Sequence, residues 1–238
     1  MREEYVYGRN PVIEVLNSGK VDKLYIQNQN DSGSIRKIFA IASDKKVLIS
    51  KVNKSKLDSL SNNGNHQGVV ALVSGYEYVE LEDLYGENIL ILDKIEDPHN
   101  FGAIARSAEA LDFKGIIIPK HNSSYVNSIV YKTSAGAIDS IKVHIATNLT
   151  NAIEKLKENS YWIYGADMQG QSIYDTKIDG KFAIVLGNEG KGVSKNIIKH
   201  CDAMISIPML GNINSLNVSC AASIIMAEIQ RKNEAAKV

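Results

Sequence analysis

Polar and charged residues that could bind a ligand or catalyse a reaction gather in three short stretches of the second half of the chain. The first contains Asn100 and Arg106, the second surrounds Glu189, and the third contains Ser215 and Asn217. Each stretch follows a short apolar run, which predicts the turn that leads out of a buried strand. Free backbone N–H groups at such turns suit a carboxylate or phosphate ligand.

The third stretch combines a strand, a loop and a capped helix. The apolar run 203–207 predicts a buried strand that ends at Pro208, because proline cannot donate to a sheet ladder. A helix is expected to follow and to run to about Lys232. Ser215 or Asn217 is expected to cap it, since both side chains accept hydrogen bonds from first-turn N–H groups.

In the first stretch, Asn100 and Arg106 stand where a strand turns into a helix. They are six positions apart, so we expect Asn100 in the loop and Arg106 on the helix. An arginine on the buried side of this alanine-rich helix would need an anionic partner, because its guanidinium stays charged. Asp93 or Asp97 could supply that partner in a structural salt bridge.

The second stretch, Leu-Gly-Asn-Glu-Gly-Lys-Gly at 186–192, has three glycines within six residues. Glycines let the backbone approach a ligand closely. Their spacing matches neither Gly-x-Gly-x-x-Gly nor a P-loop, which disfavours a dinucleotide or triphosphate site. Glu189 could orient a cation, bond a ribose or amine, or simply lie on the surface of a tight turn.

Taken in order, the three stretches resemble the signature motifs of the SpoU (TrmH-like) RNA 2'-O-ribose methyltransferases of the SPOUT superfamily. The matching strings are Asn-x-Gly-Ala-Ile-x-Arg-Ser-Ala at 100–108, the glycine stretch at 186–192, and Ile-Pro-Met with Asn-Ser-Leu-Asn-Val-Ser at 207–219. The resemblance covers residues 88–232. Cys220 replaces a common valine and Asn188 a common serine, and neither change alters charge.

The resemblance implies methyl transfer from S-adenosylmethionine to a ribose 2'-hydroxyl of RNA, without a metal. It implies that Gly187, Ile207 and Leu216 hold the methyl donor through backbone groups, and that Arg106 is the catalytic residue. The residues implied to orient Arg106 and the target ribose are Asn100, Glu189, Ser215 and Asn217. An arginine side chain, with a pKa above about 12, is a poor base, so a role as a phosphate and alkoxide clamp stands beside that of base.

Two α/β units follow from the alternation of predicted strands and helices. Residues 1–74 are predicted to be a small α/β substrate-binding domain for RNA, which the resemblance makes L30e-like. An acidic linker is expected at 75–87. Residues 88–238 are predicted to be a methyltransferase domain with a mainly parallel sheet. By resemblance this second domain is knotted, with a trefoil knot, and forms a homodimer.

The amino-terminal strings Tyr-Gly-Arg-Asn-Pro and His-Gln-Gly-Val-Val-Ala resemble the branch that modifies a guanosine in large-subunit ribosomal RNA. Formal net charge is zero, yet residues 1–74 carry 11 basic and 7 acidic side chains. Such a local excess of positive charge favours contact with RNA phosphates, although a solvated surface explains it equally well.

Composition excludes several other classes of protein. No apolar run approaches the ~20 residues of a membrane span, and no signal peptide is evident, so we expect a cytoplasmic protein without a membrane partner. Cys201 and Cys220 have no metal-ligand spacing and are expected to be buried. Three alternatives remain open: a transfer RNA 2'-O-methyltransferase, a non-catalytic RNA-binding ribosome-assembly factor, and a dinucleotide-binding α/β enzyme.

Overall fold

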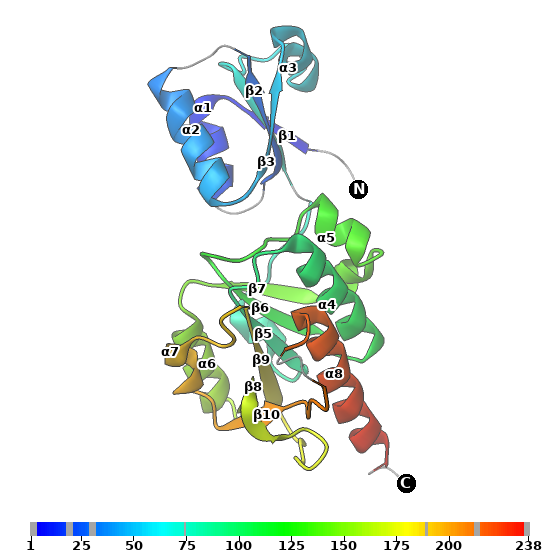
Figure 1. Cartoon of the computed structure of the whole chain (residues 1–238). Helices are drawn as coiled ribbons and strands as arrows, with labels where there is room; N and C mark the ends of the chain where they lie inside the picture. Colours follow the sequence, from blue (N-terminus) through cyan, green and yellow to red (C-terminus); the bar gives the residue numbers. More distant parts are fainter. Residues whose placement is uncertain are drawn as a thin grey trace. The chain divides into compact units, whose positions relative to one another are not determined.

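The computed structural model describes residues 4–17, 21–28, 32–73, 75–188, 190–211 and 215–235 (Figure 1). Contacts divide the chain into two compact units. One comprises Met1–Tyr76 with Tyr125–Ser128, and the other Glu77–Ser124 with Ile129–Val238. Within the described ranges, no helix is long and apolar enough to cross a membrane.

The first unit is a four-stranded sheet with three helices. Its elements are β1 (Glu4–Tyr7), α1 (Arg9–Asn17), β2 (Val21–Gln27), α2 (Gly33–Asp44), β3 (Leu48–Val52), α3 (Lys54–Leu60) and β4 (Val69–Val73). The strand order is β1-β4-β2-β3, with only β2 and β3 parallel among the described pairs. The strand β1 was not expected. Its four residues are too few to show the alternation of apolar and polar residues that identifies a strand.

Helices α1 and α2 lie side by side on one face of this sheet (Figure 1). Their apolar residues at helical spacing bury against alternate strand residues such as Val69 and Ala71. Val70 points to the other face and is fully buried, as is Leu57 of α3. Asn53 caps α3, since its Oδ1 accepts a hydrogen bond from the Lys56 N–H at 3.0 Å.

The second unit holds a six-stranded sheet in the order β10-β8-β9-β5-β6-β7, and all its pairs are parallel. This confirms the predicted α/β class with a mainly parallel sheet. Its elements are η1 (Leu81–Leu84), β5 (Ile89–Asp93), α4 (Pro98–Ala110), β6 (Gly115–Pro119), α5 (Ser128–Thr133), η2 (Ala137–Ser140), β7 (Lys142–Ala146), α6 (Leu149–Glu158), β8 (Trp162–Ser172), β9 (Phe182–Gly187), α7 (Lys195–Ile198), β10 (Ala203–Ser206) and α8 (Val218–Ala235).

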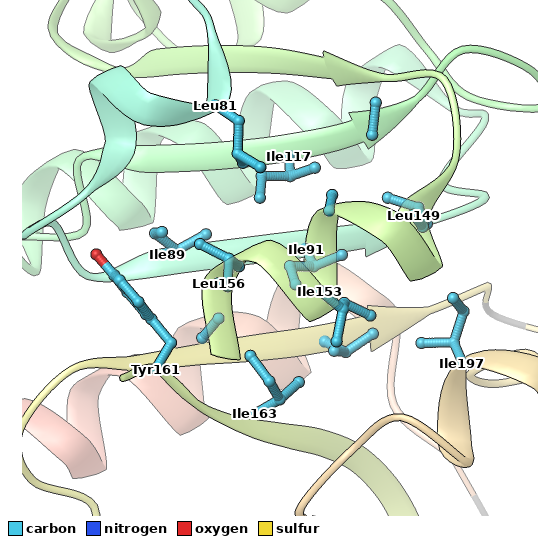
Figure 2. Close-up of a cluster of buried hydrophobic side chains, with 14 of the residues drawn as sticks. Leu81, Ile89, Ile91, Ile117, Leu149, Ile153, Leu156, Tyr161, Ile163 and Ile197 are labelled. Carbon is cyan, nitrogen blue, oxygen red and sulfur yellow. The ribbon is translucent and has the colours of Figure 1, made fainter. Parts of the chain in front are cut away.

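Helices cover both faces of this sheet, with α6 and α7 on one side and α4 and α8 on the other (Figure 1). Because both faces are covered, central strands are apolar throughout, and all five residues of β5 are buried. Figure 2 shows the α6 side, where Ile153 and Leu156 pack onto the sheet. Leu81 and Leu84, from the segment expected to be a linker, are buried in the same cluster.

Candidate active site

A cavity of about 380 Å³ lies at the carboxyl ends of β9 and β10, beside residues 166–168 in the middle of β8. Its wall includes residues that follow β9, residues that follow β10, and the start of α8. In open parallel sheets, ligands bind outside the carboxyl ends of the strands. The cavity therefore occupies the position where this type of sheet binds small molecules.

The structure brings four of the predicted site residues to this cavity. Gly187, Ile207, Ser215 and Leu216 all line it, although 29 positions separate the first from the last. Parallel strand order explains the convergence, since β9 and β10 both flank β8. The three residues predicted to hold a methyl donor through backbone groups thus share one wall.

Gly187 is required by close backbone packing. A β-carbon at this position would overlap the carbonyl carbon of Gly192 and the nitrogen of Val193. The loop folds back on itself here, and the Gly192 N–H donates to the Asn188 carbonyl at 2.7 Å. Gly192 has a φ of +65°, which favours glycine. The cavity wall at this point is therefore formed by backbone.

Asn188 holds the glycine loop to the end of β5. Its Nδ2 donates to the Lys94 carbonyl at 3.2 Å, and its Oδ1 accepts from the Gly190 N–H at 3.0 Å. Nearby, the buried Asp93 carboxylate accepts a 2.7 Å bond from the Ser194 N–H. Asn188 was noted in the sequence only as a departure from serine, and its bridging contacts could not be foreseen from a short string.

Asn100 and Asn217 are joined directly. Asn217 Nδ2 donates to Asn100 Oδ1 at 3.0 Å, and Asn217 Oδ1 accepts from the Ser219 N–H at 2.9 Å, capping α8. Asn100 lies in the first turn of α4 and is buried, so its predicted place in a loop was wrong. The helix begins earlier because Asp97 caps it through the His99 N–H and Pro98 occupies its first turn.

Arg106 lies on α4 and is exposed, so it is not on the buried side of the helix that was considered from the sequence. The salt bridge to Asp93 or Asp97 does not form. Both carboxylates accept backbone N–H groups instead, and no carboxylate of the described residues lies within 4.0 Å of the guanidinium. Two serines tie α4 to α8 near this point, with Ser107 Oγ and Ser223 Oγ 2.8 Å apart.

The predicted residues therefore form two groups. Gly187, Ile207, Ser215 and Leu216 line the cavity, and Asn100 and Asn217 lie where α4 meets α8. Arg106 does not line the cavity. Glu189 lies outside the described residues. Asp167 and Lys191 are the charged members of the described cavity wall, and neither was singled out from the sequence.

The two cysteines differ in environment. Cys201 is half-buried, its Sγ donates to the Ile197 carbonyl at 3.4 Å, and burial raises the pKa of its thiol to about 11. Cys220 is exposed, so the expectation that both are buried was wrong for it. Cys220 is two positions from the buried Val218 and Ala222, which places it on the opposite side of α8. Among the described residues, no group of three or more His, Cys, Asp or Glu side chains could hold a metal ion.

Comparison with known proteins matches both units. Residues 87–227 match the model of the SpoU rRNA Methylase family, and residues 5–79 match the model described as RNA 2'-O ribose methyltransferase substrate binding. A protein of Staphylococcus saprophyticus, named "Putative TrmH family tRNA/rRNA methyltransferase", is 41% identical over 98% of this chain and 97% of its own length.

Solved structures show the same fold. The SpoU methyltransferase AviRb of Streptomyces viridochromogenes, in complex with the cofactor AdoMet, has a TM-score of 0.64 at 22% identity, covering 98% of this chain and 91% of that one. An AdoMet-bound rRNA methyltransferase of Sinorhizobium meliloti has a TM-score of 0.60 at 23% identity, covering 97% and 88%.

Proposed function

This chain belongs to the SpoU rRNA methylase family, and from that premise we propose that it transfers a methyl group from S-adenosylmethionine to a ribose 2'-hydroxyl of a guanosine in large-subunit ribosomal RNA. The observation that carries the proposal is the convergence of Gly187, Ile207 and Leu216 on one cavity. The family motifs assign the donor to these three positions.

The cavity suits this donor. The missing side chain at Gly187 lets the loop pack back on itself, which leaves backbone in the cavity wall, and apolar walls such as Leu186 and Ile205 suit a purine ring. When bound, S-adenosylmethionine would supply a methyl group activated by its sulfonium. Two proteins that share this fold were solved with AdoMet bound.

The residues of the chain would position the acceptor ribose and stabilise the charge that develops as its hydroxyl loses a proton. Direct displacement requires in-line placement of the ribose oxygen and loss of the hydroxyl proton. We assign Arg106 to hold the target phosphate and to stabilise the developing alkoxide. Asn100, Ser215, Asn217 and Glu189 would orient Arg106 and the ribose, with Asn217 fixed by its bond to Asn100.

Arg106 does not line the cavity, so we propose a homodimer through the second unit, in which Arg106 serves the donor site of a neighbouring copy. We propose also that this unit is knotted, as the family motifs imply. Met168 lines the cavity and is 65% exposed, and Leu210 follows the cavity residue Met209 with a fully exposed side chain. Apolar side chains exposed beside a site are typical of an interface.

Ribosomal RNA is proposed because of the amino-terminal strings and the family model for residues 87–227. Transfer RNA is the second candidate, since the name of the Staphylococcus saprophyticus relative includes both RNA classes. With either RNA as substrate, we propose that methyl transfer takes place in the cytoplasm, where both RNAs are found.

Methyl transfer from labelled S-adenosylmethionine to ribosomal and to transfer RNA, followed by alkaline hydrolysis, tests the proposal. A ribose methyl group blocks cleavage, so label in an alkali-resistant dinucleotide from ribosomal RNA is expected. Label released as a mononucleotide would mean base methylation. Label in transfer RNA alone would favour the second candidate. Absence of label in both RNAs, with donor bound, would favour a non-catalytic RNA-binding protein.

A further inference from the structure

The first unit contains a polar hollow of about 700 Å³. It lies where α1 and α3 begin, beside the end of β2 and the loop that precedes β4. Its wall consists of Arg9, Gln27, Lys54, Asp58 and the six residues 63–68. Every one of these residues is either a glycine or carries a polar or charged side chain.

The composition of this wall specifies a type of ligand. Gln27, Asn63 and Asn65 each carry a carboxamide with donor and acceptor atoms, which is the chemistry needed to bond the edge of a nucleobase. Arg9 and Lys54 add two positive charges, and phosphate groups are their natural partners. An apolar ligand would find no matching surface among these residues.

The one carboxylate of the wall is already engaged. His66 Nδ1 accepts the Gly68 N–H at 3.0 Å, so Nε2 carries the ring proton and donates to Asp58 Oδ1 at 3.0 Å. His66 is buried, and this pair joins the loop to α3. Arg9 and Lys54 face this single carboxylate, so positive charge exceeds negative charge in the wall.

Arg9 is held at the edge of the hollow by the same loop. Its backbone N–H donates to Gln67 Oε1 at 3.1 Å, and its Nε donates to the Gln67 carbonyl at 3.2 Å. Nη1 donates to Ser34 Oγ at 2.7 Å. These bonds fix the guanidinium plane, while its further N–H groups can donate to a ligand.

The loop itself is held in an uncommon conformation. Asn63 and Gln67 have positive φ angles of 60° and 51°, which residues other than glycine adopt infrequently. A β-carbon at Gly64 would lie 2.6 Å from the ring of Tyr7, so only glycine permits this contact. Such strain is maintained where a fixed shape serves binding.

We infer that this hollow binds an unpaired nucleotide of the RNA substrate, with Arg9 and Lys54 on the phosphate and the carboxamides on the base. The inference rests on the proposed function and adds to it the place where RNA is read. Specific RNA recognition targets unpaired nucleotides, whose base edges are free to bond.

The experiment measures binding of full-length protein to a large-subunit ribosomal RNA transcript over a range of salt concentrations. Lys54→Gln and Asn65→Ala change exposed side chains, so both variants should fold. Arg9→Lys keeps the charge and loses the planar fork. Lys37→Gln and Arg36→Gln, exposed on α2 and outside the hollow, are the matched controls.

We expect each hollow variant to lose roughly tenfold in affinity, and the controls to lose less than about twofold. Lys54→Gln should also reduce the slope of log affinity against log salt by about one, whereas Asn65→Ala should leave that slope unchanged. Hollow variants that bind like the controls would overturn the inference.

Parallel assays separate this inference from the proposed function. If wild-type protein methylates RNA and the hollow variants bind it normally, the inference fails and the methyltransferase assignment stands. If wild-type protein binds RNA but transfers no methyl group, the assignment fails, and the binding comparison still decides whether the hollow is the RNA site. Donor affinity should be equal in all variants.

Discussion

Asn217 and Asn100 form a hydrogen bond across 117 positions of sequence, with Nδ2 of the first donating to Oδ1 of the second at 3.0 Å. The same Asn217 side chain caps α8 through the Ser219 N–H. One residue therefore sets where α8 begins and how it meets α4, the helix that carries Arg106. These two tasks can be separated by substitution.

Asn217→Ser should keep the cap and lose the bond to Asn100, because serine is a good N-cap but too short to span the gap. We expect the free energy of unfolding to fall by about 1 kcal/mol, because the bond to the buried Asn100 is lost while the cap remains. Methyl transfer should fall roughly tenfold or more, since small displacements at a reacting site are costly. Asn148→Ser, which replaces the cap of α6, is the matched control. Equal activity in both variants would show that the Asn100 bond has no role in transfer.

Gly187→Ala should weaken donor binding. The new β-carbon would overlap backbone atoms of Gly192 and Val193, and no side-chain rotation relieves such an overlap. We expect donor affinity, measured by calorimetry, to fall by more than about tenfold. Gly33→Ala is the control, because no atom lies within 4 Å of the added carbon. Normal donor affinity in Gly187→Ala would remove the glycine loop from the donor site.

Arg106→Gln should separate binding from chemistry. Arg106 is exposed and outside the cavity wall, so we expect unchanged Tm and unchanged donor affinity. The rate of methyl transfer should fall about 100-fold, as expected when one group that stabilises developing charge is removed. Arg36→Gln, exposed on α2, controls for loss of charge. A variant that retains full rate would exclude Arg106 from the reaction.

Cys201 should resist alkylation near neutral pH, because burial holds the pKa of its thiol at about 11 and only the thiolate reacts. In a Cys220→Ser background, labelling by iodoacetamide should be slow at pH 8 and rise about tenfold per pH unit up to pH 10. Rapid labelling at pH 8 would contradict the raised pKa of the half-buried Cys201 thiol.

The raised pKa of Cys201 also predicts how stability depends on pH. Well below pH 9 the thiol is protonated in both the folded and unfolded states. Between pH 9 and about 11 the unfolded chain ionises first, so this residue makes stability fall as pH rises. Cys201→Ala should remove that part of the decline in denaturant unfolding experiments. Identical pH profiles for wild type and Cys201→Ala would show that the thiol does not titrate abnormally.

Much of the second unit follows from local pattern. The apolar runs of β5, β6 and β9 identify buried parallel strands, because strands covered on both faces are apolar at every position. The cap of α8 could be narrowed to Ser215 or Asn217 for a similar reason, since a cap depends on neighbours two or three residues away, and the structure shows that it is Asn217.

Other features depend on partners far away in sequence. The strand β1 exists through its pairing with β4, which lies more than 60 residues further along the chain. Arg106 is exposed, and Asp93 and Asp97 bond backbone N–H groups instead of its guanidinium, which nothing in the residues around Arg106 reveals. The bridging role of Asn188 requires Lys94, which is 94 positions away.

The sequence by itself therefore determined the fold class, the family motifs and most helices and strands, because these depend on periodicity and on residues close together in the chain. Only the tertiary structure decided that Gly187, Ile207 and Leu216 share one cavity, that Asn217 contacts Asn100, and that Arg9 and Lys54 face one hollow. Such contacts arise from strand order and loop closure, which bring together groups that no local pattern relates.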